Sequence, residues 1–163
     1  MSNLETTYYK SPIGLTKIIG DENGIQSISV LDDSSSSCNL QEEVPDCLQE
    51  CITQLKEYFK GTRTVFDLKL NPQGTEFQQK VWKELLNIPF NKVSTYLAQT
   101  KALGDVKAIR AVASANGKNP IWIVIPCHRV IGSDGSLTGY AGGLWRKKWL
   151  LEHENPVKQQ SLF

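Results

Sequence analysis

The chain contains 163 residues, of which 40% are hydrophobic, and its formal net charge is +1 at pH 7. This length suffices for one ordinary domain or two small ones, and the apolar content excludes wholesale disorder. No uncharged apolar run reaches the roughly 18 residues of a membrane span, and the first residues lack the pattern of a secretory signal. We therefore expect an intracellular protein, cytoplasmic in a bacterium or archaeon and nuclear in a eukaryote, whose four cysteines are thiols.

The charge is distributed unevenly along the chain. Residues 1–71 carry 6 Lys+Arg and 11 Asp+Glu, a net charge of −5, whereas residues 72–163 carry 12 and 6, a net charge of +6. A basic half indicates an anionic partner, most often nucleic acid, although a mixed-sign surface that only maintains solubility explains the numbers equally well. The pattern predicts an acidic structural domain over 1–71, a basic domain over 72–155 and a flexible tail over 156–163.

The acidic half predicts a small antiparallel or mixed sheet followed by a helix. Three apolar-rich strands are expected over 6–9, 15–19 and 25–31. A polar loop follows over 32–37, and residues 65–70 are a candidate for a last strand.

A helix is expected from Pro45 to Phe59, because apolar residues recur there at helical spacing and Gly61 ends the run. These residues are Leu48, Ile52, Leu55 and Phe59. Cys47 and Cys51 lie four residues apart on this helix, a spacing that suits metal ligands. No nearby histidine or further cysteine completes a ligand set, so buried thiols are the simpler interpretation and no metal is expected.

The basic half begins with a helix that a capping box starts, since Thr75 and Gln78 have the required spacing. Its inward residues are expected to be Phe77, Val81 and Leu85, with Trp82 as a further candidate. Ser94 is positioned to cap a second short helix, which ends at Gly104, and a third helix is expected over 105–116. Two short helices joined by a glycine-containing turn are typical of a helix-turn-helix.

The third helix has an apolar face and a face of mostly small side chains. The apolar face consists of Val106, Ile109, Val112 and Ala113, and the opposite face of Lys107, Arg110, Ala111 and Ser114. Small side chains around a single arginine suit close approach to a minor groove about 6 Å wide. An alanine-rich helix packed inside a protein core is the alternative interpretation.

A buried strand is expected over 121–125, and it leads to Cys127 and His128. Adjacent side chains on an extended chain point in opposite directions, so these two meet only if the backbone turns after Pro126. A cysteine that is merely buried is the alternative. A glycine-rich loop containing Tyr140 follows, and then a helix over 144–154. In that helix Trp145, Trp149 and Leu150 are expected to pack, and His153 and Glu154 to end it.

Three blocks in this order resemble the O6-alkylguanine-DNA alkyltransferases, also called methylated-DNA–protein-cysteine methyltransferases. They are Pro126-Cys127-His128-Arg129-Val130, Gly139-Tyr140-Ala141-Gly142-Gly143-Leu144 and residues 149–154. The resemblance extends through Ser94-Thr95-Tyr96, Arg110-Ala111-Val112 and Asn119-Pro120 and covers residues 75–154; the N-terminal half matches in length and element order. It implies an α+β protein with a winged-helix-like helix-turn-helix in its C-terminal domain.

By this resemblance, Cys127 is the acceptor thiol, and His128 takes its proton through a water while Glu154 holds the imidazole in the useful tautomer. Tyr96 hydrogen-bonds the guanine as negative charge develops on it, and Asn119 secures the turn before the active site. No cofactor takes part. The product is a thioether, which thiol exchange does not cleave, so each molecule reacts once.

The resemblance also implies how DNA is held. The base must leave the stack before its O6 atom can be reached, and Arg110 fills the vacated space. Tyr140 walls the base pocket, and the backbone near Ala141 and Val130 faces the base. The remaining DNA contacts implied are Thr95, Tyr96, Ala111, Ser114 and Ser133. The substrate is double-stranded DNA bearing O6-alkylguanine, with O4-alkylthymine as a second lesion, bound through the minor groove by a monomer.

Two departures and one short motif add hypotheses. Trp122 lies where many relatives have a small residue or proline, and we expect it to narrow the pocket against bulky adducts such as benzyl. The zinc site of some relatives lacks an evident ligand set. The tail resembles peptides that dock on the bacterial sliding clamp, with Gln159, Leu162 and Phe163 as contacts, although five-residue matches arise easily by chance.

Other functional classes compete with alkyl transfer. A non-catalytic lesion sensor of the alkyltransferase-like type carries tryptophan at the acceptor position, where this chain has Cys127. A plain helix-turn-helix regulator has no need for the Pro-Cys-His turn. A Cys-His hydrolase leaves Arg110, Tyr96 and the basic half unexplained.

Overall fold

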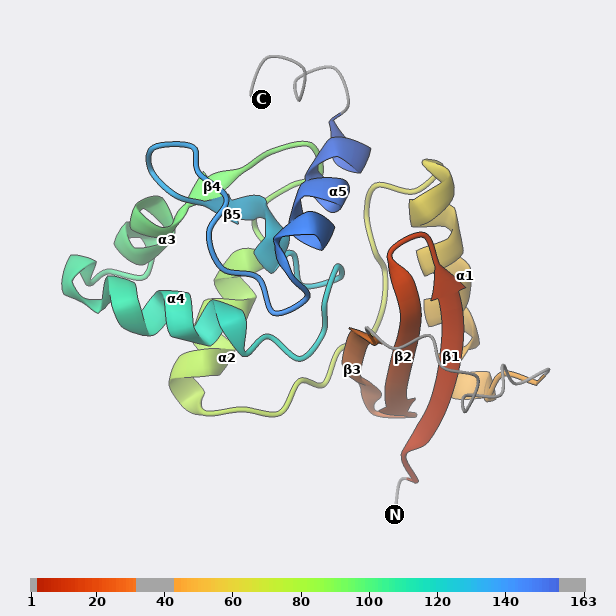
Figure 1. The fold of residues 1–163 in the computed structure, drawn as a ribbon. Coiled ribbons are helices and arrows are strands. Elements are labelled where there is room, and N and C mark those ends of the chain that lie inside the picture. The colour runs from red at the N-terminus through yellow and green to blue at the C-terminus, as the bar shows by residue number, and fades with distance from the viewer. Residues whose placement is uncertain (1–2, 32–42, 156–163) are drawn as a thin grey trace. The chain divides into compact units, whose positions relative to one another are not determined.

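The computed structural model describes residues 3–31 and 43–155, and the chain divides into two compact units, Met1–Gln73 and Gly74–Phe163 (Figure 1). The first unit holds a three-stranded antiparallel sheet and a helix, and the second is mostly helical, so the predicted α+β class is confirmed. The predicted polar loop over 32–37 and the tail over 156–163 lie outside the described residues. Among the described helices, none has the length and apolar character needed to cross a membrane.

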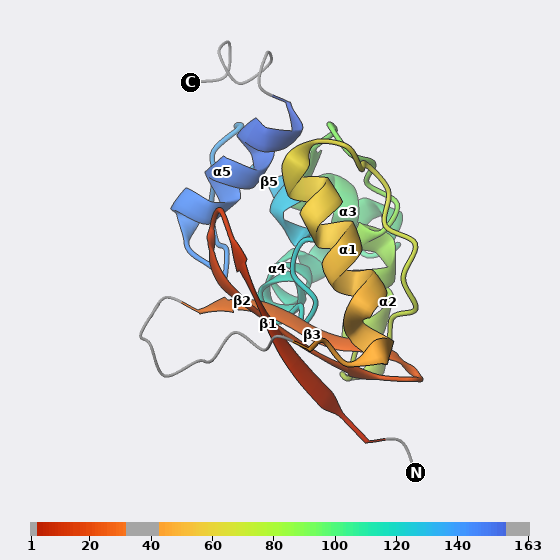
Figure 2. The same ribbon diagram turned by 90° about the vertical axis from the view of Figure 1, so that its right-hand side faces the viewer.

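In the first unit, β1 (Glu5–Ser11), β2 (Gly14–Asp21) and β3 (Gly24–Leu31) form a meander in the order β1-β2-β3. Helix α1 (Asp46–Lys60) packs on the sheet (Figure 2). The core residues with no exposed surface are Ile18, Ile28, Leu48, Leu55 and Tyr58. Phe59 is only half-buried, because Tyr58 instead turns inward and its ring meets that of Phe66 at 5.4 Å.

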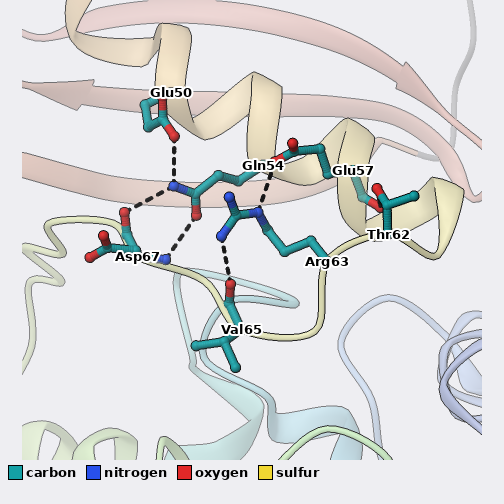
Figure 3. A network of polar contacts seen from close by, with 7 residues as sticks. All are labelled: Glu50, Gln54, Glu57, Thr62, Arg63, Val65 and Asp67. Carbon is teal, nitrogen blue, oxygen red and sulfur yellow. Dashed lines mark hydrogen bonds and ion pairs between the residues drawn. The ribbon is translucent and has the colours of Figure 1, made fainter.

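The expected strand over 65–70 is wrong, apart from a single bridge between Leu70 and Ile25. Side chains of α1 and of the residues just after it bond the backbone groups that a sheet would use (Figure 3). Gln54 accepts a hydrogen bond from the Asp67 N–H at 2.8 Å and donates to the Asp67 carbonyl at 3.0 Å. Arg63 donates to the Val65 carbonyl at 2.8 Å. These bonds hold residues 65–67 beside the helix. The end of the segment joins β3 through only two backbone bonds, from the Ile25 N–H to the Lys69 carbonyl at 2.8 Å and from the Asn71 N–H to the Ile25 carbonyl at 2.7 Å.

The second unit opens with α2 (Glu76–Leu85), which starts at the predicted capping box. The Thr75 hydroxyl accepts from the Gln78 N–H at 3.1 Å, and the Gln78 side chain accepts from the Thr75 N–H at 2.9 Å. Val81, Trp82 and Leu85 are buried, whereas Phe77 on the first turn is 40% exposed and does not join the core.

We expect Thr75→Ala to lower the free energy of unfolding by about 1 kcal/mol, because the Gln78 N–H loses its acceptor at the helix start. Urea denaturation followed by circular dichroism measures the change. Thr75→Ser keeps the hydroxyl and serves as the matched control, so an equal loss in both variants contradicts the capping role.

The predicted helix-turn-helix consists of α3 (Tyr96–Ala102), the 3-10 turn η1 (Val106–Ala108) and α4 (Ile109–Gly117). Ser94 does not cap α3. It lies in β4 (Ser94–Thr95), which pairs in parallel with β5 (Val130–Ile131), and the Thr95 side chain caps the helix by accepting from the Ala98 N–H at 3.0 Å.

The apolar face expected for the third helix is mostly exposed. Val112 is fully buried, whereas Val106, Ile109 and Ala113 are exposed. Ala115 and Asn116 are buried beside Val112 instead. The packed-core interpretation of this helix is therefore wrong for most of its length.

The last helix is α5 (Leu144–Glu154), with the bounds that the sequence predicts. Leu150 is buried, Trp149 is half-buried against the His153 ring, and Trp145 is 55% exposed. Two cationic residues, Arg146 and Lys147, are buried, whereas Trp145 beside them is not.

Candidate active site

Residues 121–125 form turns rather than the expected strand. Ile123 has a positive φ of 73°, and the Ile125 N–H donates to the Ile121 carbonyl at 3.1 Å. The Asn119 side chain braces the turn: its Oδ1 accepts from the Ile121 N–H at 2.9 Å, and its Nδ2 donates to the Ile125 carbonyl at 2.8 Å. The same Nδ2 lies 3.3 Å from the Sγ atom of Cys127. Asn119 therefore fixes both the backbone turn and the thiol that follows it.

The next turn, η2 (Cys127–Arg129), orients three adjacent side chains. Cys127 is 9% exposed, and burial raises the pKa of its thiol. The Asn119 N–H and the positive charge of Lys147 oppose this shift because both favour the thiolate. The hydrogen bond from Asn119 and the charge of Lys147 thus offset part of the cost of forming a buried thiolate.

His128 is fully buried and its Nε2 lies 2.7 Å from Oε2 of Glu154. Burial lowers the pKa of His128, while the Glu154 carboxylate raises it in part. The pKa of Glu154 lies well below its ordinary value, because the interactions with His128 and Arg129 outweigh its burial. An ionised carboxylate only accepts, so Nε2 carries the proton and Nδ1 presents a lone pair. Within the described residues, the buried Nδ1 has no hydrogen-bond partner.

Arg129 completes this network from the other side of the carboxylate. Its Nε donates to Glu154 Oε1 at 2.8 Å and a terminal nitrogen donates to Oε2 at 3.1 Å. A second terminal nitrogen donates to the Ile88 carbonyl at 2.8 Å. Both carboxylate oxygens are therefore engaged, which holds Glu154 rigidly against the imidazole.

A cavity of about 440 Å³ opens beside Cys127, and most of its lining is apolar. One wall is a face of α4, formed by Ile109, Arg110, Ala113, Asn116 and Gly117. The other lining residues are Tyr96, Cys127, Thr138, Gly139, Tyr140 and Ala141. The exposed apolar side of α4 thus lines a binding cavity, which is why it is not packed in a core.

Lys147 bonds three residues that line this cavity, and the sequence did not predict its role. Its Nζ donates to the carbonyls of Thr138 at 3.0 Å and Gly139 at 3.3 Å, and to the Tyr96 hydroxyl at 3.4 Å. The Tyr96 hydroxyl itself donates to the Thr138 carbonyl at 2.8 Å. Burial lowers the pKa of Lys147 to about 8, although Cys127 raises it in part.

A sequence signal for Lys147 exists. It shares one helical face with Leu150, Leu151 and Glu154, all of which are buried. A lysine on a buried helical face requires partners for its ammonium group, and a loop distant in sequence supplies them here.

The structure brings five of the predicted site residues to the cavity: Tyr96, Arg110, Cys127, Tyr140 and Ala141. Asn119 does not line the cavity but donates to the Cys127 thiol, and His128 and Glu154 bond each other in the adjacent buried network. The other predicted site residues do not line the cavity: Thr95, Ala111, Ser114, Trp122, Val130 and Ser133. Val130 is fully buried in β5, and Ala111, Ser114 and Ser133 are exposed elsewhere on the unit.

Trp122 contacts the pocket wall rather than the pocket. Its ring lies 5.8 Å from that of Tyr140, centroid to centroid. A side chain at Gly142 would come within 2.9 Å of both rings, so only glycine permits this packing. Any effect of Trp122 on the width of the cavity is therefore transmitted through Tyr140.

No group of three or more His, Cys, Asp or Glu residues suited to a metal ion occurs within 3–31 and 43–155. Cys47 and Cys51 both have a raised pKa, that of Cys51 reaching about 12, chiefly because of burial. Such thiols are inert compared with one that has donors beside it.

Both units match models of one protein family. The DNA-binding domain of 6-O-methylguanine DNA methyltransferase matches residues 76–156, and its ribonuclease-like domain matches residues 4–72. A methylated-DNA–protein-cysteine methyltransferase of Methanosarcina mazei is 47% identical over 152 residues, covering 91% of this chain and 96% of the relative. A relative of the same name from Mycobacterium tuberculosis is 42% identical and covers 88% of each chain.

Solved structures agree with these matches. The crystal structure of M. tuberculosis O6-methylguanine methyltransferase has a TM-score of 0.83 at 39% identity and covers 94% of both chains. The structure of M. tuberculosis OGT in complex with DNA also has a TM-score of 0.83, at 41% identity, and covers 93% of this chain and 92% of that chain.

Proposed function

Because the chain belongs to the 6-O-methylguanine DNA methyltransferase family, we propose that it repairs DNA by moving the alkyl group from O6 of guanine to Cys127. The observation that carries this proposal is the Cys127 thiol at a cavity, with Asn119 donating to it and with His128, the next residue in the chain, held by Glu154. A lesion sensor of the alkyltransferase-like type is not favoured, since the acceptor position holds a cysteine.

The transfer is a substitution at carbon. The Cys127 proton passes through a bridging water to Nδ1 of His128, and the thiolate sulfur attacks the alkyl carbon. The S–C bond forms as the C–O6 bond breaks, and the electron pair of that bond goes to the base. The Tyr96 hydroxyl, supported by the Lys147 ammonium group, stabilises this charge or protonates the base. Cys127 keeps the alkyl group as a thioether, so each molecule acts once.

The DNA contacts are further parts of this proposal. Double-stranded DNA binds through its minor groove to the small side chains of α4, the protein acts as a monomer, and the alkylated base enters the cavity. Arg110, exposed at one end of the cavity wall, occupies the space that the base leaves. The basic charge of residues 72–163, net +6, attracts the phosphates.

Three narrower proposals accompany it. Trp122 disfavours bulky adducts by pressing Tyr140 toward the cavity, so Trp122→Pro should raise benzyl transfer relative to methyl transfer. The tail docks on a sliding clamp through Gln159, Leu162 and Phe163. Clamp binding that persists in the Leu162→Ala and Phe163→Ala variants contradicts this proposal. The protein works in the compartment that holds the genome.

Mass spectrometry of the intact protein and its peptides, after mixing with a duplex containing one O6-methylguanine, tests the function. We expect one added methyl group on the Cys127 peptide and none on the Cys51 peptide. Cys127→Ser should stay unmodified. Tight binding to the lesion without any change in mass places the protein among the lesion sensors and refutes transfer.

Replacing Lys147 with methionine should slow transfer from the lesion duplex by about 10- to 100-fold, because Tyr96 loses its cationic partner. The pKa of Lys147 falls from an ordinary 10.5 to about 8. The unfolded chain therefore holds a proton between these pH values that the folded protein has lost, and the stability of the wild type rises with pH across this window.

Lys147→Met lacks this rise and should be at least as stable as the wild type at pH 7. Single-turnover kinetics and urea denaturation at pH 7 and pH 10 measure both effects. Lys148→Met, at the exposed neighbouring position, is the matched control. A variant that transfers at the wild-type rate excludes Lys147 from the reaction.

A further inference from the structure

Two buried amides join α3 and α4, neighbouring helices that both contribute residues to the lining of the cavity. Gln99 of α3 is 2% exposed and Asn116 of α4 is 5% exposed. The Gln99 Nε2 donates to Asn116 Oδ1 at 2.8 Å, and the Asn116 Nδ2 donates to Gln99 Oε1 at 2.7 Å. We infer that this reciprocal pair, the amide clasp, positions α4 against α3 and thereby sets the width of the alkylguanine cavity.

Both helices that the clasp connects supply residues to the cavity. Tyr96, the first residue of α3 and three residues before Gln99, lines it. Arg110, Ala113 and Asn116 lie along one face of α4 and line the same cavity. Asn116 belongs to the clasp and to the wall at once, so any movement that breaks the clasp also moves the wall.

Few residues of α4 are buried. Its first turn is exposed, and the buried residues Val112, Ala115 and Asn116 lie toward its C-terminal half. Two polar anchors fix this half: the Trp82 indole N–H donates to the Ala115 carbonyl at 2.8 Å, and the clasp holds the next residue. Apolar contacts tolerate sliding, whereas two short hydrogen bonds in a buried site fix both distance and orientation.

The inference rests on the proposed function for its biological meaning, since it names the part of the fold that selects adducts by size. Without the clasp, only the Trp82 bond and the packing of Val112 and Ala115 hold α4, so Arg110 and Ala113 are able to shift relative to Tyr96. The cavity then accepts larger groups while the geometry for attack on a methyl group worsens. Gln99 is therefore a positioning residue that acts through Asn116.

The rate of alkylation of Cys127 by two reagents of different size tests the width without relying on DNA. Iodoacetamide and N-benzyliodoacetamide are compared by peptide mass spectrometry in wild type, Gln99→Met and the exchanged pair Gln99→Asn/Asn116→Gln. Lys101→Met, exposed on the same helix, is the matched control. Asn116→Ala removes the same two bonds from the other side, so the test does not depend on one variant folding.

The ratio of interest is the rate of alkylation by N-benzyliodoacetamide divided by the rate with iodoacetamide. We expect this ratio to rise about tenfold in Gln99→Met and Asn116→Ala, and to return toward the wild-type value in the exchanged pair. Transfer from the O6-methylguanine duplex should slow about tenfold in the two single variants. An unchanged ratio in folded single variants overturns the inference, because a merely stabilising pair affects both reagents equally. If the ratio of alkylation rates changes but no variant, nor the wild type, accepts a methyl group from the duplex, the proposed function is refuted. The inference that the clasp sets the cavity width is then still supported.

Discussion

Glu154→Gln should slow alkyl transfer to Cys127 by roughly 100- to 10,000-fold. The carboxylate accepts from Nε2 of His128 at 2.7 Å and so keeps the lone pair on Nδ1. A glutamine amide in the same place is able to donate to Nε2, which moves the proton to Nδ1 and removes the acceptor that we propose for the thiol proton. Single-turnover transfer from an O6-methylguanine duplex, followed by mass, measures the loss.

The same substitution should lower the free energy of unfolding by about 3–5 kcal/mol at pH 7, because Arg129 is left as a buried charge without its anion. The pKa of Glu154 is depressed in the folded protein from an ordinary 4.5, so its contribution is present above that pH and is lost as the pH falls below it. The stability difference between wild type and variant should therefore shrink in acid.

Glu152→Gln is the matched control on the same helix. Its carboxylate is largely exposed and lies 3.8 Å from Lys148, so the change should cost about 0.5 kcal/mol or less and leave transfer intact. If Glu154→Gln transfers at the rate of this control, the carboxylate has no part in activating the thiol. Urea denaturation between pH 3 and pH 8 provides the stability data for both variants.

The parts of the fold that a local sequence pattern encodes were predictable. The Thr75–Gln78 capping box and the bounds of α5 depend on neighbouring residues, and both occur as expected. Family recognition rested on separated blocks in the right order and is confirmed by the matches over residues 4–72 and 76–156.

Features that depend on distant partners were not predictable. The β-branched run over 121–125 has the composition of a strand, yet the Asn119 side chain satisfies its backbone and bends it into turns. Lys147 is buried because carbonyls of residues 138 and 139 receive its ammonium group. A single sequence does not reveal which loop returns to which helix, so these contacts needed the structure.

The exposed face of α4 illustrates a different limit. Helical periodicity marks Val106, Ile109 and Ala113 as apolar and predicts that they are buried. Ile109 and Ala113 are exposed because they line the wall of a cavity, whereas Val106 is exposed outside it. Periodicity identifies an apolar surface, and whether the protein or a ligand covers it depends on the tertiary structure.

Arg110→Ala should slow transfer from an O6-methylguanine duplex by about 100-fold, whereas alkylation of Cys127 by iodoacetamide should be unchanged. Holding a base outside the stack costs a few kcal/mol, and in the proposed binding mode the arginine side chain offsets part of this cost by filling the gap. Loss of about 2–3 kcal/mol corresponds to roughly 30- to 150-fold in rate. Reaction with a small reagent requires no extruded base and does not depend on the arginine.

Lys107→Ala separates this role from simple charge attraction. Lys107 is exposed on η1, immediately before α4, and does not line the cavity. Its loss should weaken binding to damaged and undamaged duplex equally and reduce the salt dependence of binding by about one phosphate contact. If Arg110→Ala behaves like Lys107→Ala, Arg110 contributes only charge. If it instead slows the duplex reaction alone, its side chain acts on the extruded base, and the cavity wall of α4 is both the DNA-binding surface and the device that holds the lesion out.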